Sequence, residues 1–119
     1  MFQLYVIPTG EDQLAFDAGK KPRNVIKREF ATAEERDEYK NGIEDVNDLA
    51  EHSIEDETPT SLTIVFDGSD EDTYDFDSEA EKEAYKQGLD DGDGFKSPLV
   101  LDGDEDPEEF ARLDVMLKA

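Results

Sequence analysis

Aspartates at alternate positions near the C-terminal end of the chain could coordinate a divalent cation. Asp102, Asp104 and Asp106 have the spacing of the first three ligands of a calcium-binding loop. Pro107 then takes the place of the required glycine, and Leu113 takes that of the closing glutamate. The pattern therefore predicts weak, unselective cation binding at most, and we expect no dedicated metal site and no cofactor.

Nucleophilic and acid–base catalysis have little support in the residue types. The chain has no cysteine, and its single histidine, His52, follows Glu51 in a polar segment, as a solvated linker histidine would. Carboxylates are so abundant that no catalytic pair stands out. There is no glycine-rich phosphate loop and no basic–aromatic stripe for nucleic acid. We expect a protein that is not an enzyme, has no catalytic residues and does not bind nucleic acid directly.

The acidic residues themselves are the strongest signal in the sequence. The chain of 119 residues contains 34 acidic and 12 basic residues, for a net charge of −22. Residues 41–119 carry 26 of these acids and only 5 of the bases. Self-repulsion on this scale destabilises a compact state, so a salty environment, a bound cation or a basic partner must compensate for it.

Carboxylates recur at helical spacing in two segments. Residues three or four apart on a helix lie about 5–6 Å from one another, a spacing similar in scale to that of phosphates along a nucleic-acid strand. Rigid rows of this kind predict a phosphate-like array that attracts a basic protein. The rows are Asp37, Asn41, Glu44, Asp45 and Asp48, and Glu79, Glu83, Gln87 and Asp90; the partner-binding residues that we expect are Asp45, Asp48, Asp75, Asp77, Glu79, Glu83, Asp90 and Asp91.

In size and charge the chain resembles the DNA-mimic proteins, many of them from phages or mobile elements, that inhibit restriction, CRISPR or DNA-repair enzymes. The resemblance implies an inhibitor that occupies the basic site of a nucleic-acid-binding enzyme. One alternative is a generic or halophile-adapted cytosolic domain, which the excess of Asp over Glu (18 to 16) suits and the excess of Lys over Arg (8 to 4) does not. A remote alternative is a module that binds divalent cations through clustered carboxylates.

One short segment is basic. Its members are Lys20, Lys21, Arg23, Lys27 and Arg28. We interpret this cluster as an intramolecular counter-charge for the acidic remainder of the chain. A second contact site is the alternative interpretation.

An internal repeat organises the chain. Residues 30–45 and 76–91 align at an offset of 46 positions and share Phe, Glu, Tyr, Lys, Gly and a final Asp. Most of the positions at which the two segments differ are conservative exchanges. So dense a match indicates a duplicated structural unit.

Each copy has the signals of a helix that follows a strand. Thr32 and Ser78 stand where the helices should begin, with a glutamate three residues later in both copies, which is capping-box spacing. In the first copy the apolar spacing extends the predicted helix to Glu51. Gly42 then lies inside the helix and indicates close packing, whereas Gly88 fits either the interior or the C-terminal end of its helix.

These signals predict an α+β fold in one domain, residues 1–119: an antiparallel sheet with helices on one face. Two ββα units, in residues 1–50 and 61–95, precede a C-terminal strand and helix in residues 98–118, with residues 51–60 as a connector. The expected strands are 3–8, 24–31, 61–66, 73–77 and 98–101, with a turn at 67–70 and a last helix at 107–118.

The location that we expect is the cytoplasm. No apolar stretch approaches the roughly 20 residues of a membrane span. The N-terminus also lacks the basic region of a signal peptide. Binding to an anionic lipid surface is disfavoured by the charge of the chain.

Overall fold

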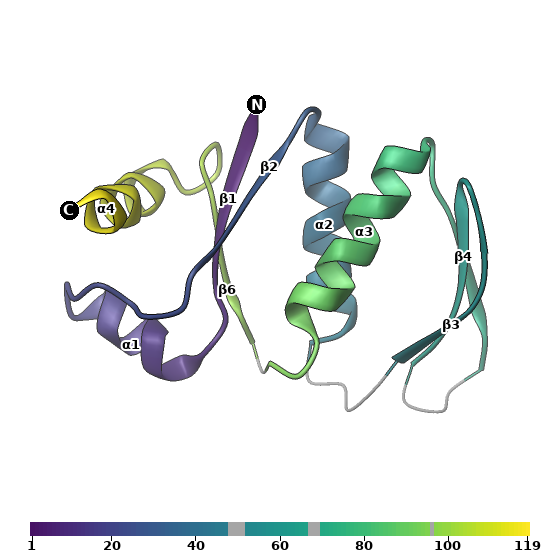
Figure 1. Ribbon diagram of the computed structural model, residues 1–119, viewed down its shortest axis with the longest axis horizontal. Helices are drawn as coiled ribbons and strands as arrows, with labels where there is room; N and C mark the ends of the chain where they lie inside the picture. The colour runs from purple at the N-terminus through teal and green to yellow at the C-terminus, as the bar shows by residue number, and fades with distance from the viewer. Residues whose placement is uncertain (48–51, 67–69, 96) are drawn as a thin grey trace.

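The computed structural model describes residues 1–47, 52–66, 70–95 and 97–119. Figure 1 shows the arrangement of the helices and strands within these residues. In chain order they are β1 (Phe2–Ile7), α1 (Gly10–Asp17), β2 (Ile26–Phe30), α2 (Ala33–Asp45), β3 (His52–Thr58), β4 (Ser61–Phe66), β5 (Asp72–Asp75), α3 (Glu79–Gly92), β6 (Leu99–Asp102) and α4 (Pro107–Lys118).

The strands form two antiparallel sheets, and the helices lie in two layers. Sheet A has the strand order β2-β1-β6, and sheet B has the order β3-β4-β5. In Figure 1, α2 and α3 lie between the two sheets, and α1 and α4 lie on the outer side of sheet A. The α+β class is confirmed. The structure differs from the expected arrangement in having two sheets, because the segment predicted as a connector forms strand β3.

The two repeat units exchange their last strands. Strand β3 follows α2 in the chain but pairs with β4 of the second unit, whereas β6 follows α3 and pairs with β1 of the first. Leu4 of β1 lies opposite Asp102, and Leu62 of β4 lies opposite Glu57 at the equivalent position. Each sheet is therefore completed by the other unit, and neither unit contains a whole sheet of its own.

Helices α2 and α3 pack against each other through the repeated glycines. A Cβ atom on Gly42 would lie 2.3 Å from the carbonyl oxygen of Tyr85, and one on Gly88 would lie 2.1 Å from that of Tyr39. Because Gly92 likewise approaches Ile43, the contacts advance in the same direction on both helices, which therefore run parallel. The close packing predicted for Gly42 is confirmed, and Gly88 also lies inside its helix.

Equivalent apolar residues fill the spaces between the helices and the sheets. Leu4 and Val6 of sheet A pack on Tyr39 and Ile43, and Leu62 and Ile64 of sheet B pack on Tyr85 and Leu89 (all eight at most 3% exposed). The outer face of sheet A has a further core, in which Tyr5, Ile7 and Leu101 meet Phe16 of α1 and Leu113 of α4.

The helix caps follow the sequence signals. The side chains of Thr32 and Ser78 accept hydrogen bonds from the backbone N–H of Glu35 and Glu81, each at 3.1 Å. Two boundaries differ from the prediction. Helix α2 ends at Asp45 instead of residue 51. Residues 10–17 form helix α1, which was not predicted because only one of its apolar side chains, Phe16, is buried. The turn predicted at 67–70 falls mostly outside the described residues.

Candidate partner-binding surface

A pair of tyrosine–aspartate hydrogen bonds joins the two helices near their C-terminal ends. The Tyr39 hydroxyl donates to Asp91, and the Tyr85 hydroxyl donates to Asp45, both at 2.5 Å. These four residues are related by the repeat, so the bonds are reciprocal. Burial, followed by the bonded carboxylate, raises the pKa of each tyrosine hydroxyl well above its usual value.

The two aspartates differ in their counter-charge. Asp91 is buried and accepts two hydrogen bonds from Arg28, at 2.8 and 2.9 Å, and a third from Gln87. Burial opposes ionisation of Asp91, but the bonds from Arg28, Tyr39 and Gln87 outweigh it and hold its pKa below the usual range. Position 74, which the repeat places in register with Arg28, is a tyrosine, so Asp45 lacks this cation.

Four basic residues of α2 and α3 hold the exchanged strands in place. Arg36 and Lys40 form ion pairs with Asp102 at the end of β6, at 3.3 and 3.4 Å. Lys82 and Lys86 form equivalent pairs with Glu57 of β3, at 2.6 and 2.9 Å. Arg36 and Lys82 are buried, so the structure uses much of its limited positive charge internally.

Most acids on the helix pair have no lysine or arginine within ion-pair distance among the described residues; Asp37, paired with Arg36 at 3.2 Å, is an exception. A shallow hollow of about 310 Å³ lies where α2 begins and β5 leads into α3. Six of its seven lining residues are acidic, and none is basic. Parallel helices place both positive dipole ends on this side, which favours negative charge there. The hollow, called the acidic hollow below, is lined by Glu34, Asp37, Glu38, Asp75, Phe76, Asp77 and Glu81.

Repulsion within the acidic hollow affects Glu38. Partial burial raises the pKa of this carboxyl above its usual range, and the charges of Glu81, Asp45 and Asp37 raise it further. A hydrogen bond donated by Asn41 opposes the shift without cancelling it. A cationic group placed in the hollow would relieve this repulsion.

The repeat shows that the acidic hollow is not a simple product of duplication. The positions equivalent to its lining residues contain only three acids. Alanines stand at 31, 80 and 84, where the hollow has Asp77, Glu34 and Glu38. The acidic hollow therefore has six acidic residues, and the equivalent positions of the repeat have three.

The structure distributes the predicted partner-binding residues over several places. Asp75 and Asp77 lie together in the acidic hollow, and Glu79, Glu83 and Asp90 are exposed on α3. Asp45 is half-buried and accepts the hydrogen bond of the Tyr85 hydroxyl. Asp91 is buried under Arg28, which withdraws its carboxylate from the surface. Asp48 lies outside the described residues.

Four residues of the acidic hollow were absent from the predicted set. Glu34, Asp37, Glu38 and Glu81 reach the hollow only because the helices are parallel and begin at the same end. Asp37 stood in a predicted acidic row, but helical spacing alone does not tell which row meets the second unit.

The aspartates considered for metal binding and the histidine considered for catalysis make contacts within the fold. Asp102 accepts a hydrogen bond from the backbone of Asp104, and Asp106 accepts one from that of Asp102. Within the part of the chain that the structure describes, no group of three or more His, Cys, Asp or Glu residues is arranged to hold a metal ion. His52 lies on β3, with Nδ1 4.0 Å from a carboxylate oxygen of Asp93.

Two further findings bear on the type of protein. Among the described residues, no helix is long and apolar enough to span a membrane. A scan against protein-family models and searches of curated proteins and solved structures give no match.

Proposed function

We propose that this protein is a non-enzymatic inhibitor of the DNA-mimic type, which occupies the basic nucleic-acid site of a partner enzyme in the cytoplasm. The observation that carries the proposal is the acidic hollow, where six carboxylates from both units converge and no lining residue is basic. Among the described residues only one of the six, Asp37, has an ion pair, with Arg36 at 3.2 Å. The net charge of −22 adds long-range attraction to a positively charged cleft.

The internal ion pairs support this proposal. A protein that needed acidity only for solubility would gain from spreading its cations among its surface acids. Here four basic residues pair with acids at the strand ends, and of these cations only Arg36 also reaches the acidic hollow, at Asp37. The four are Arg36, Lys40, Lys82 and Lys86. Partial burial, together with the neighbouring carboxylates, raises the pKa of Glu38 and disfavours its charged form, and a cation of a basic partner would offset that cost.

Capture from a lysate tests the proposal. The immobilised protein is expected to retain DNA-binding enzymes that duplex DNA releases at constant ionic strength. Capture should fall when the acidic hollow is neutralised by Glu34→Gln, Glu38→Gln, Asp75→Asn and Asp77→Asn, four acids without an ion pair in the described residues. A matched variant, Glu11→Gln, Asp17→Asn, Glu108→Gln and Glu109→Gln, changes the same charge on α1 and α4 and should capture normally.

Two results would contradict the proposal. One is the capture of no nucleic-acid-binding enzyme at any salt concentration, which would favour the generic acidic or halophile-adapted domain. The other is an equal loss of capture in the two fourfold variants, which would mean that total charge matters and that the acidic hollow does not.

A further inference from the structure

A second, larger concavity lies beside the acidic hollow. It has a volume of about 530 Å³, lies between α2 and β6, and is called the α2–β6 groove below. This volume is within the range of ligand-binding pockets. Asp37 lines both concavities, so the groove continues the acidic surface along α2.

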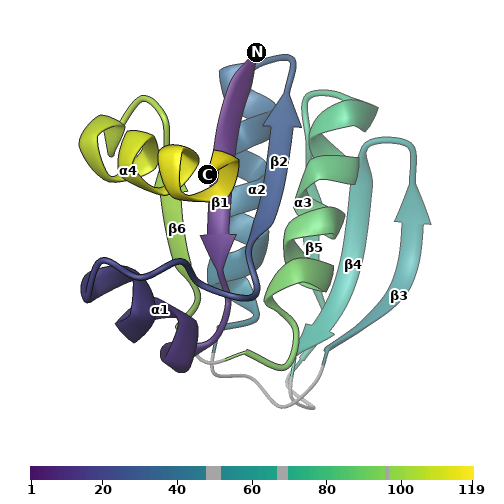
Figure 2. The ribbon, with the colours of Figure 1, turned by 60° about the vertical axis from the view of Figure 1, so that its left-hand side comes forward.

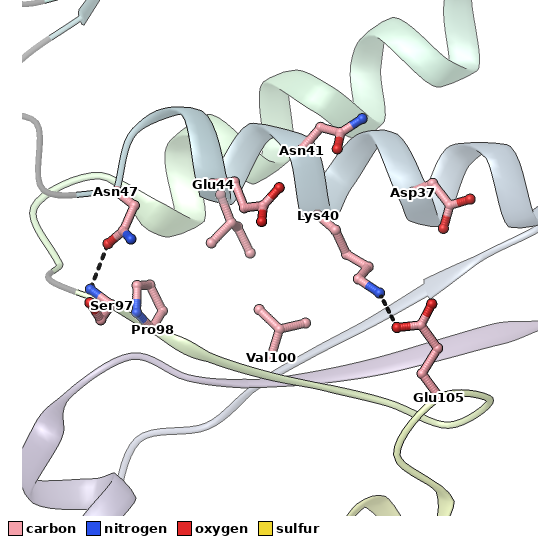
Figure 3. Close-up of a pocket in the computed structure, with 10 residues that line it drawn as sticks. Asp37, Lys40, Asn41, Glu44, Asn47, Ser97, Pro98, Val100 and Glu105 are labelled. Atoms are coloured by element: carbon pink, nitrogen blue, oxygen red, sulfur yellow. Dashed lines mark hydrogen bonds and ion pairs between the residues drawn. The ribbon is translucent and has the colours of Figure 1, made fainter.

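The groove combines an apolar lining with carboxylates. Ile43, Pro98 and Val100 supply the apolar surface, and Figure 3 shows Pro98 and Val100 opposite α2. Glu44 and Glu105 contribute acids from the helix and from the segment that follows β6. A ligand that suits these walls has an aliphatic stem and a positively charged head, which is the design of a lysine or arginine side chain.

Lys40 already uses one end of the groove in this way. Its ammonium group donates to Glu105 at 3.0 Å and to Asp102 at 3.4 Å, and Figure 3 shows the side chain reaching from α2 toward Glu105. Glu44 lies one helical turn further along α2. Glu44 lines the same groove, and across the described residues no lysine or arginine lies within ion-pair distance of it.

Ser97 forms the rim of the groove next to Glu44, and hydrogen bonds hold its conformation. Ser97 has a φ of +52°, a left-handed conformation that is unfavourable for a residue other than glycine. Its N–H donates to the Asn47 side chain at 2.7 Å, and its carbonyl oxygen accepts from Gln13 of α1 at 3.1 Å. A preformed rim lowers the entropy lost when a side chain enters the groove.

We propose that the α2–β6 groove receives a lysine or arginine side chain of the partner, with its stem on Pro98 and Val100 and its charged head at Glu44. The inference rests on the proposed function and adds a specific contact to it. The acidic hollow attracts the basic surface at long range, and the groove fixes one of its side chains in register.

NMR titration with a minimal probe tests the groove without the partner. N-acetyl-arginine methylamide is added to the labelled protein at physiological ionic strength, with the citrulline analogue as an uncharged probe of nearly equal shape. The arginine probe should give saturable shifts at the amides of Glu44, Asn47 and Val100, and the citrulline probe should not. Glu44→Gln should weaken binding about threefold to tenfold, whereas Glu108→Gln, an exposed acid on α4, should leave it nearly unchanged.

Several outcomes would overturn the groove proposal. These are shifts that spread over the acidic surface without saturating, equal effects of Glu44→Gln and Glu108→Gln, or binding of spermidine where the arginine probe does not bind. Lys96 precedes Ser97 in the sequence and falls outside the described residues, so Lys96→Gln is measured as well. Binding seen only in that variant would also count against the proposal.

The groove and the proposed function can fail separately. If the probe experiment fails while capture remains sensitive to DNA and to the acidic hollow, the proposed function stands and the groove is not its contact. If the arginine probe binds at Glu44 but no DNA-binding enzyme is captured, the groove binds a cationic side chain and the DNA-mimic function is wrong.

Discussion

The two units have the same inner architecture but different outer faces. Sheet A buries Tyr5, Ile7 and Leu101 under α1 and α4. Sheet B has Ser61, Thr63 and Thr73 on the corresponding side, with the two threonine hydroxyls 3.0 Å apart. None of the helices in the described part of the chain covers β3 and β4 on that side in Figure 2. Duplication thus preserved the helix pair and the inner core, while the charged and outer surfaces diverged.

The same contrast appears in the charges. Asp91 forms an ion pair with Arg28, whereas a tyrosine takes the equivalent position beside Asp45. Three acids of the acidic hollow have alanine at the equivalent position of the repeat. The difference at Arg28 affects the stability of the fold, and the acids of the hollow affect the surface that a partner would contact. Variants made in pairs, one in each unit, separate these two roles.

The largest effect is expected at the helix pair, where the units are alike. Gly88→Ala and Gly42→Ala would each place a Cβ within 2.3 Å of a backbone oxygen, so the helices must separate. We expect each to lower the free energy of unfolding by more than the ~1–3 kcal/mol typical of overpacking. Urea denaturation would show this, and Gly10→Ala, with no atom within 4 Å of its Cβ, is the control.

The outer faces should differ in their sensitivity to truncation. Leu113 is fully buried between α4 and sheet A, so Leu113→Ala should destabilise the protein by about 3 kcal/mol. Thr63→Ala on the outer side of sheet B should change stability by about 0.5 kcal/mol or less. Equal losses in thermal or urea melts would mean that sheet B is also covered.

The two aspartates should also respond unequally. Asp91→Asn removes a buried charge from beside Arg28, and we expect a loss of about 2 kcal/mol, reduced from the value for a fully buried pair because Arg28 is partly exposed. Asp45→Asn keeps a partner for the Tyr85 hydroxyl, and about 1 kcal/mol or less is expected. A larger loss for Asp45→Asn in matched urea titrations would contradict the asymmetry.

The smallest effect concerns pH. Because the pKa of Glu38 is raised on folding, its charged form destabilises the folded protein at neutral pH, and this penalty disappears as the pH falls through the raised pKa. Glu38→Gln should therefore be more stable than the natural chain by about 0.5 kcal/mol at neutral pH. The difference should vanish in acid, and Glu108→Gln reports the effect of net charge alone.

Sequence patterns predicted the features that depend on neighbours in the chain. The caps at Thr32 and Ser78 and the helical position of Gly42 are of this kind. The exchange of β3 and β6 was not predictable, because it depends on pairing between distant strands. Residues 52–58 of the segment predicted as a connector form β3, an edge strand of sheet B.

The candidate site was predicted only in part, for a related reason. Asp75 and Asp77 were identified from the charge of their segment, but their neighbours Glu34 and Glu38 depend on the parallel helix packing. The repeat made Asp91 look equivalent to Asp45, although Arg28 lies 63 positions from Asp91 in the chain. Extending the repeat alignment back to residues 28 and 74 would have revealed this difference.

Competition for a captured enzyme tests the central claim most directly. The fluorescence anisotropy of a labelled duplex bound to that enzyme is measured while this protein is added. We predict that the duplex is displaced completely, that more duplex restores its binding, and that the variant with the neutralised acidic hollow displaces it far less well than the matched α1 and α4 variant. A ternary complex of enzyme, duplex and this protein would contradict the claim that the acidic surface occupies the nucleic-acid site.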